Sequence, residues 1–324
     1  MSKLPAPSRQ ESQPPLSPTL SDYSGVSSSQ GTVVQLTENF RLNPDLGEFV
    51  STIYSRGFKP QKVQAKQLAT ELKSIEQDIE QDLGVQPQVL RDVQKFLLAL
   101  SDVMLRQPQT VLLSPPITVD RRSKADTLDP LTPTPISLAL IRLQTESIRP
   151  EGVGYEAHVR GEAALAAALI TSIRRCSPGE DIFVATPHRI QRQAVKAALE
   201  LTQLHDLTKK MGRIGLQVSH RHQPGKVTVD TVERLQGSEA AFVICLFSLP
   251  PSATSDLGFL LERRRLNVAI SRAKTLCILV SSPGVLRPPV DVLANPENAK
   301  GYAFLRAFED RAWSSVIRVD LDKF

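Results

Sequence analysis

From residue 136 to residue 281 the sequence alternates short β-branched runs with segments that repeat apolar residues at helical spacing. This alternation is typical of a parallel sheet covered by helices. It predicts strands near 136–143, 181–185, 226–230, 242–247 and 276–281, with helices at 162–175, 190–204 and 262–274. We therefore expect a doubly wound α/β domain, a fold that binds ligands at the carboxyl ends of its strands.

The residues before this pattern divide into segments of different character. Residues 1–32 are rich in Ser, Pro and Gln and poor in large apolar side chains, so disorder is expected there. Two helical patterns, separated by Gly84 and Pro87, predict a helical hairpin over 62–105 whose apolar stripes serve as packing faces. Residues 106–135 are punctuated by proline, which predicts a linker or loop.

Composition narrows the class of protein. The chain has 324 residues, 41% of them hydrophobic, which is enough for one large domain or two modest ones. It shows no apolar stretch near the ~18 residues of a membrane span and no apolar signal core, so we expect an intracellular protein, nuclear or cytoplasmic, with no membrane partner. A net charge of +5 fits a polyanionic partner without requiring one. Neither the three cysteines nor the histidines have the spacing of metal ligands, so no metal site is predicted.

The segment 229–239 places polar residues directly after a predicted strand. The chain turns through Gly237, and Thr231, Gln236 and Glu239 are expected at the carboxyl end of that strand, the edge at which ligands bind. A solvated turn is an equally good interpretation of this segment taken alone.

The segment 262–274 predicts a helix that combines an apolar face with a cluster of arginines, and Arg272 lies near its end. A guanidinium stays charged at physiological pH, and its planar fork matches phosphate oxygens. The alternative is a surface helix with solvated charges, which is the usual role of such a run.

Taken together, these segments resemble a known family. Residues 231–239 resemble motif V, and residues 265–274 resemble motif VI, of superfamily 1 helicases in the branch that includes the nonsense-mediated-decay helicase. Residues 36–44 resemble motif IV, in which an arginine follows an aromatic residue, and 184–191 resemble a strand-to-helix segment that usually contains Thr-Pro-Tyr and a later Gln. The four segments follow the order of the family.

The match has departures. His188 stands where the family tends to have Tyr, and Glu233 and Leu235 stand where Asp and Phe are common. The sequence contains no Gly-x-x-x-x-Gly-Lys-Ser/Thr loop for phosphates and no apolar strand ending in Asp-Glu for Mg²⁺. The first RecA-like domain of these helicases is therefore expected to be absent from this chain.

The resemblance implies a RecA-like fold for the C-terminal motor domain. That domain would begin at 33–61 with motif IV, be interrupted by the hairpin at 62–105 and the linker at 106–135, and continue over 136–324. ATP and Mg²⁺ would be its cofactors only when a first RecA-like domain is present, in cis or in trans. Its other partner would be single-stranded RNA or DNA.

The resemblance also implies roles for individual residues. Arg41 and Arg272 would be the catalytic arginines that stabilise charge as the γ-phosphate leaves. The positions expected near the nucleotide are Gln236, Gly237, Glu239 and Arg265. The positions expected on the strand backbone are Thr186, His188 and Thr231.

Three interpretations of the whole chain remain open. It can be a fragment of a longer helicase, a stand-alone nucleic-acid- or protein-binding module that has lost ATPase chemistry, or a domain that pairs in trans with a separate first domain. The first is favoured, because a decayed module has no need to keep both arginines with Gln236 and Glu239. The chain alone is expected not to hydrolyse ATP.

Overall fold

A computed structural model describes residues 38–39, 44–51, 59–60, 70–75, 85–106, 136–148, 154–211, 224–235, 237–250, 252–253 and 256–323. The segment 1–32, which was expected to be disordered, lies outside the described residues, as does nearly all of the linker at 106–135.

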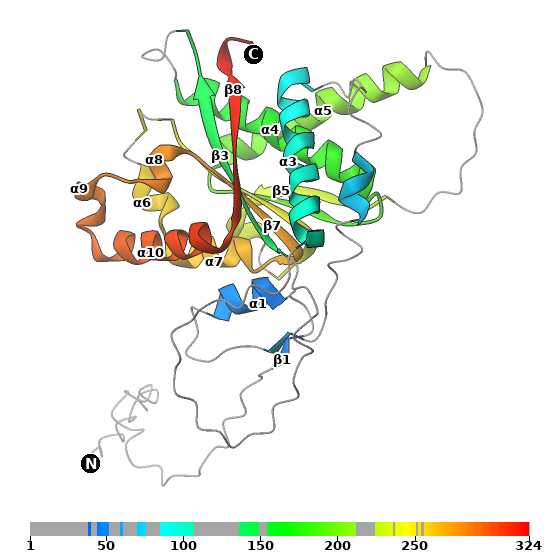
Figure 1. Cartoon of the computed structure of the whole chain (residues 1–324). Helices are drawn as coiled ribbons and strands as arrows, with labels where there is room; N and C mark the ends of the chain where they lie inside the picture. Colours follow the sequence, from blue (N-terminus) through cyan, green and yellow to red (C-terminus); the bar gives the residue numbers. More distant parts are fainter. Residues whose placement is uncertain are drawn as a thin grey trace, which may run out of the picture. The chain divides into compact units, whose positions relative to one another are not determined.

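The main feature is a six-stranded sheet in which every pair of neighbouring strands is parallel (Figure 1). The order is β5-β4-β6-β7-β3-β8. The strands are β3 (Leu138–Glu146), β4 (Ile182–Thr186), β5 (Val227–Thr231), β6 (Ala240–Phe247), β7 (Ala273–Ser281) and β8 (Trp313–Asp320). Every residue of β4 and β6 is buried, as expected for strands covered on both faces. This confirms the doubly wound α/β prediction.

All five predicted strands are present, and β8 is a sixth that the sequence did not suggest. It lies at the edge of the sheet beside β3. Its side chains alternate between exposed and buried, so that Val316 is 47% exposed while Ile317 and Val319 are buried. An edge strand that is half solvated lacks the continuous apolar run of a central strand.

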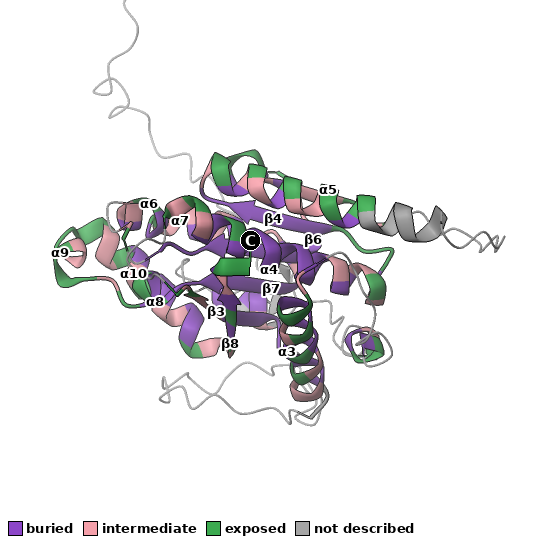
Figure 2. Ribbon diagram, turned by 90° about the horizontal axis from the view of Figure 1, so that it is seen from above, coloured by how far each residue is buried: buried purple, intermediate pink, exposed green. Residues whose placement is uncertain are grey.

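Three helices pack on one face of the sheet: α3 (Pro87–Arg106), α4 (Tyr155–Cys176) and α5 (Arg189–Met211). Figure 2 shows the strands beneath the helices as almost entirely buried. α3 is the second arm of the predicted hairpin; of the first arm, the structure describes only residues 70–75. Phe96 of α3 packs on Trp313 of β8 with ring centroids 5.2 Å apart, so α3 is part of the domain core.

The other face is covered by α1 (Pro44–Ser51), α6 (Leu257–Leu260), α7 (Arg263–Ile270) and α10 (Pro296–Arg311), with the short helices α8 (Pro283–Leu286) and α9 (Val290–Leu293). Phe49 of α1 lies against Phe304 and Phe308 of α10, with centroid distances of 4.8 and 5.4 Å. Two 3₁₀ turns, η4 (Val232–Leu235) and η6 (Leu321–Lys323), and a two-residue pair, β1 (Glu38–Asn39) with β2 (Lys59–Pro60), complete the described elements.

The predicted helix over 262–274 is shorter than expected. α7 ends at Ile270, Ser271 is its C-cap, and β7 already begins at Ala273. Arg272 therefore lies in a two-residue turn between helix and strand, where its backbone N–H donates to the carbonyl of Ala269 at 3.3 Å. Arg272 is thus flanked by a helix and a strand, so its backbone is fixed more firmly than that of a residue at a frayed helix end.

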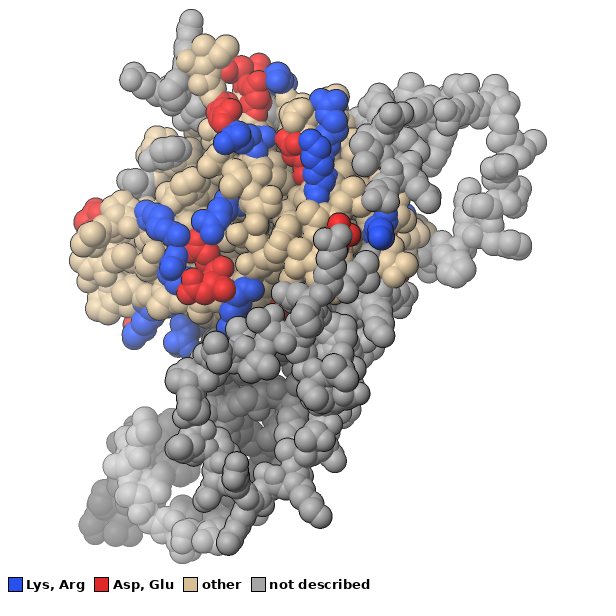
Figure 3. All heavy atoms as spheres, in the orientation of Figure 1, with Lys and Arg blue, Asp and Glu red and all other residues tan. Residues whose placement is uncertain are grey.

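Charged side chains of both signs lie beside one another on the surface (Figure 3). The most enclosed example is Glu309 of α10, whose side chain is 4% exposed and lies within 3.0 Å of Arg142, 2.8 Å of Arg287 and 2.6 Å of Arg306. Arg142 belongs to β3, so this cluster ties α10 to the sheet.

Candidate functional site

The predicted site residues divide between two opposite edges of the sheet. Thr186 and Thr231 end β4 and β5 and are paired in register, so both lie at the carboxyl edge. Glu239 and Arg272 directly precede β6 and β7, whose first residues Ala240 and Ala273 are paired, so these two lie at the amino edge.

This division corrects one prediction. Thr231, Gln236 and Glu239 were expected together at the carboxyl end of one strand. That is wrong for Glu239, because η4 carries the chain from the end of β5 to the start of β6, and parallel strands begin at the opposite edge. Gln236 lies outside the described residues.

At the amino edge, Arg272 lies beside the loop that precedes β6. Its Nη1 donates to the carbonyl of Ser238 at 3.4 Å, and its own carbonyl accepts from the N–H of Ala240 at 3.1 Å. Glu239 forms an ion pair with Lys274 of β7 at 2.7 Å. Gly237 has φ of 87°, a conformation that favours glycine, so the loop needs glycine at this position.

Arg265 lies at the other end of α7, on the order of 10 Å from Arg272 by the helical rise. Its guanidinium binds Glu233 at 2.9 Å and Glu262 at 2.8 Å, and it covers the ring of Phe259 at 3.6 Å. With its side chain 13% exposed, Arg265 is committed to contacts within the domain. This arrangement links motif V to motif VI.

An aromatic stack continues from Arg265 toward the carboxyl edge. The ring of His188 stacks on Phe259 with centroids 4.8 Å apart, and Tyr155 meets His188 edge-on at 6.3 Å. The side chain of Phe259 is 39% exposed, although phenylalanine is usually buried. Phe259 was not among the candidate site residues predicted from the sequence. Its position six residues before Arg265, the first arginine of motif VI, was the available signal.

Near β5, one of the three expected strand-contacting side chains is bonded to the backbone. Thr186 is fully buried, and its hydroxyl donates to the carbonyl of Asp230 at 3.3 Å, so this hydroxyl does not reach the surface. The carboxylate of Asp230 accepts from the N–H of Thr231 at 2.8 Å and from Arg192 at 2.9 Å. Thr231 and His188 are partly exposed. The roles assigned to all three stay predictions.

Beneath this surface lies a buried polar network that the sequence did not predict. The carboxylate of Glu162, with no exposed surface, accepts from Gln191 Nε2 at 2.7 Å and lies 2.6 Å from Ser248 Oγ. Ser248 in turn lies 2.9 Å from His158 Nε2, and His158 Nδ1 lies 3.3 Å from the hydroxyl of Thr145. The signals in the sequence were a glutamate within an alanine-rich helix and a serine directly after β6.

Burial shifts the pKa values of this network in opposite directions. Burial raises the pKa of Glu162 to about 7, although the hydrogen bonds with Ser248 and Gln191 act to lower it. Burial lowers the pKa of His158 to about 4. Burial, followed by the charges of Glu162 and Asp256, raises the pKa of Tyr155 to about 12. Near pH 7 only Glu162 among these three exchanges a proton.

The raised pKa of Glu162 predicts a pH-dependent stability. Its folded pKa lies above the unfolded value, so the native state binds the extra proton and is stabilised below about pH 4.5, and that stabilisation is lost as pH rises through about 7. Between pH 6 and pH 8 the wild type should lose about 1 kcal/mol of unfolding free energy from this group. Glu162→Gln should lose none of it. Urea unfolding of both proteins at the two pH values measures the difference, and equal pH dependence would contradict the assignment.

The described residues contain no group of three or more His, Cys, Asp or Glu side chains arranged to hold a metal ion. No helix among them is both long and apolar enough to cross a membrane. Arg41 lies outside the described residues, so its predicted role stays a prediction.

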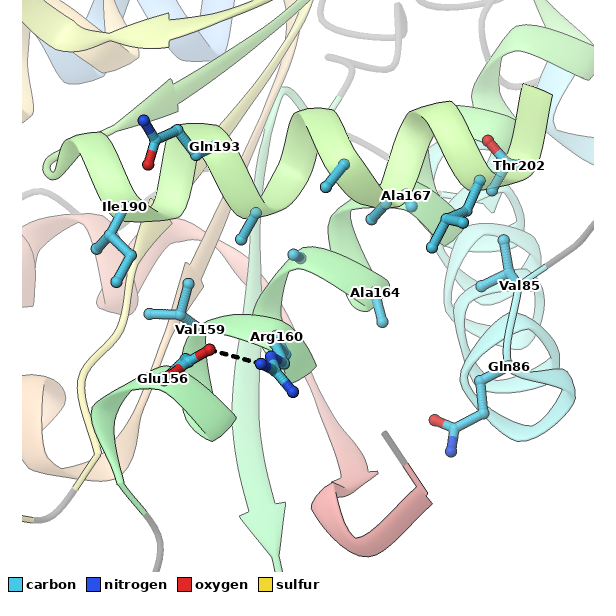
Figure 4. A pocket seen from close by; sticks show the side chains of 15 residues that line it. Val85, Gln86, Glu156, Val159, Arg160, Ala164, Ala167, Ile190, Gln193 and Thr202 are labelled. Carbon is cyan, nitrogen blue, oxygen red and sulfur yellow. Dashed lines mark hydrogen bonds and ion pairs between the residues drawn. The ribbon is translucent and has the colours of Figure 1, made fainter. Parts of the chain in front are cut away.

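A pocket of 660 Å³ lies between α4, α5 and the residues that precede α3 (Figure 4). Its lining is mainly alanine and other apolar side chains, including Val85, Val159 and Ile190. The charged side chains among its lining residues, Glu156 and Arg160, pair with each other at 2.5 Å. The pocket therefore presents no set of converging polar groups for chemistry.

Comparison with known proteins agrees with this architecture. The family model described as "AAA domain" matches residues 21–284. "Regulator of nonsense transcripts 1 homolog" of Neurospora crassa is 31% identical over 145 residues, which cover 44% of this chain and 12% of that protein. ECM32 of Saccharomyces cerevisiae, whose name describes an ATP-dependent RNA helicase, is 33% identical over 129 residues, 34% of this chain and 11% of that protein. The protein mov-10-B.2 of Danio rerio is 32% identical over 115 residues, 33% of this chain and 10% of that protein.

The chain thus spans about a tenth of the length of the curated relatives it matches. The family match covers most of the chain and includes the segments that resemble motifs IV, V and VI, with the sheet that these segments require. The chain belongs to the AAA domain family, as a C-terminal RecA-like domain of the superfamily 1 helicases in the nonsense-mediated-decay branch.

Proposed function

We propose that this domain is the second half of an ATP-driven motor that acts on single-stranded RNA or DNA. The observation that carries the proposal is the separation of motif residues between two edges: Arg272 with Glu239 at the amino edge, and Thr231 with His188 at the carboxyl edge. One domain then offers a phosphate-binding cation at one place and a strand-binding surface at another.

The nucleotide role rests on Arg272. Its backbone lies between the half-buried helix α7 and the buried strand β7, and its guanidinium donates to the Ser238 carbonyl, so it can be aimed across a cleft at a γ-phosphate held by a second domain. The sequence has neither a phosphate loop nor an Asp-Glu strand. The proposal therefore assigns the phosphates and Mg²⁺ to a first RecA-like domain, in cis or in trans. Arg41 has the same proposed role on the resemblance alone.

The strand role rests on the start of α5 and the end of β5. A helix start exposes backbone N–H groups that suit a phosphate, and α5 begins at Arg189. Arg189, next to His188, and Arg234, three residues after Thr231, are exposed cations beside the pair Arg192–Asp230, and the carboxylates of Asp230 and Glu233 lie among them. Contacts of this kind bind the backbone and read no sequence.

The test is a titration of the chain against two unrelated single strands, each as RNA and as DNA, at low and high salt. We expect weak, salt-sensitive binding with little sequence preference, because phosphate contacts release counterions. Arg189→Ala should reduce the slope of log affinity against log salt by about 0.7, the value for one phosphate contact on a single strand.

Arg175→Ala is the matched control, since Arg175 is an exposed arginine in the last turn of α4. It removes the same charge from the opposite edge of the sheet and should leave the slope unchanged. Tight binding that ignores salt, a strong preference for one sequence, or equal effects of the two variants would each contradict a backbone grip at the carboxyl edge.

A further inference from the structure

The first turn of α5 is closed by a side chain from within the helix. The backbone N–H of Arg192 donates to the carbonyl of His188 at 3.3 Å, so His188 occupies the N-cap position. Three residues further on, Gln191 Oε1 accepts from the backbone N–H of His188 at 3.1 Å. This is the returning bond of a capping box, and it holds the turn between β4 and α5.

The amide of Gln191 has two possible orientations, and its surroundings select one. Its Nε2 donates to Glu162 at 2.7 Å and, over a longer distance of 3.4 Å, to the carbonyl of Leu246. An ionised carboxylate only accepts hydrogen bonds, so it requires the NH₂ group and leaves Oε1 for His188. A protonated Glu162 carboxyl can also donate a hydrogen bond, so it tolerates the reversed orientation of the Gln191 amide. In that orientation the NH₂ group of Gln191 faces the N–H of His188, and the hydrogen bond between them is lost.

We propose that Glu162 is a positioning residue for the strand-contacting turn at His188, acting through the amide of Gln191, and that loss of its negative charge loosens this turn. The consequence for strand binding rests on the proposed function. The effect on the turn itself does not, because it concerns only groups inside the domain.

The two other titratable groups beside Glu162 in this network, Tyr155 and His158, do not change charge near neutral pH. Tyr155 and His158 lie on the same helix as Glu162, and their shifted pKa values, about 12 and about 4, keep both neutral between pH 6 and pH 8. Burial lowers the pKa of His188, on which the charges of Asp256, Arg265 and Glu233 also act. Among Glu162, Tyr155 and His158, Glu162 is the one whose pKa, raised by burial to about 7, falls within this range.

The experiment is amide hydrogen exchange on the full chain labelled with ¹⁵N only at histidine. The protein has five histidines, so the His188 amide can be followed among few signals. We expect its protection factor, which corrects for the intrinsic effect of pH, to rise about fivefold between pH 6 and pH 8, the size of a lost or gained helix cap. The ¹³C signal of the Glu162 carboxyl should titrate with the same midpoint.

Glu162→Gln is the matched variant, because it keeps the shape and removes the charge. Its carbonyl oxygen can still accept from Gln191, while its NH₂ group faces the Ser248 hydroxyl, which can accept a hydrogen bond. In this variant the protection factor of the His188 amide should change little between pH 6 and pH 8. Any effect of the titration of the His188 ring is present in both proteins and cancels in the comparison. The His158 amide, which donates to the Gly154 carbonyl at 3.3 Å, is the internal control.

Strand affinity, measured on the same two proteins, should rise with pH about fivefold more in the wild type than in the variant. A flat wild-type profile, different midpoints for the carboxyl and the amide, or an equal rise in Glu162→Gln overturns the proposal. If the variant does not fold, agreement or disagreement of the two wild-type midpoints decides. If the amide behaves as expected but no strand binds, the positioning role stands and the proposed strand function fails.

Discussion

Arg272→Ala is expected to lower nucleic-acid-stimulated ATP hydrolysis about 10³-fold or more when this domain is joined to a competent first RecA-like domain. An arginine that meets the γ-phosphate mainly as charge develops stabilises the transition state and contributes little to ground-state binding. Strand affinity without nucleotide should therefore change little. The measurement is the stimulated hydrolysis rate beside strand affinity for wild type and variant.

The position of Arg272 makes the truncation interpretable. Leu266, Ala269 and Ile270 of α7 are buried, and the fold is anchored by them and by the buried strand that follows. The fold should thus survive loss of the Arg272 side chain.

Arg272→Lys should recover only part of the rate, because an ammonium keeps the charge and loses the planar fork. Arg175→Ala is the matched surface control. The isolated chain should hydrolyse ATP no faster than buffer. Near-normal hydrolysis by Arg272→Ala, or a defect that follows a lower melting temperature, would show that Arg272 is a structural residue.

Gly301→Ala is expected to destabilise the domain by about 3 kcal/mol, the upper part of the range for overpacked cores. A Cβ at Gly301 in α10 would lie 1.4 Å from the carbonyl oxygen of Leu261 and 2.6 Å from its carbon. These are backbone atoms that cannot rotate away, so α10 would have to move. That movement would separate Phe304 and Phe308 from Phe49 of α1.

Gly284→Ala provides the comparison, because a Cβ at Gly284 of α8 meets no atom within 4 Å. It should leave the urea midpoint nearly unchanged, and alanine is favoured over glycine inside a helix. Both variants are compared with the wild type by urea unfolding. Similar midpoints for all three proteins would mean that α10 does not approach Leu261 as closely as described.

The strands at the centre of the sheet were predictable, since a strand buried on both faces requires a continuous apolar run, as in 242–247. β8 was not, because alternation with Ser314, Val316 and Arg318 on the exposed side looks the same in a loop. The end of α7 was misplaced for a related reason. Arg272 and Lys274 continue the helical pattern of charge, and only pairing of Ala273 with Ala240 shows that the strand has begun.

The candidate site could be proposed from sequence where its residues belong to one short motif. Motif spacing pointed to Arg272 and Glu239, whose roles stay predictions, but their shared edge depends on the path of η4. The network around Glu162 brings together Gln191 and Ser248, which are 29 and 86 residues away. A single sequence holds no signal for such partners, because each bond depends on which strands become neighbours in the sheet.

The order of the strands sets a condition on how the chain reaches its fold. β3 is the first strand of the six-stranded sheet to be synthesised, but its two neighbours are β7 and β8. Gln144 of β3 is in register with Arg318 of β8, 174 residues later. Until β7 is complete, β3 has no strand to pair with, and its apolar residues have only helices to cover them. Folding is therefore governed by closure of long loops, which makes it slow and leaves an aggregation-prone strand exposed during synthesis.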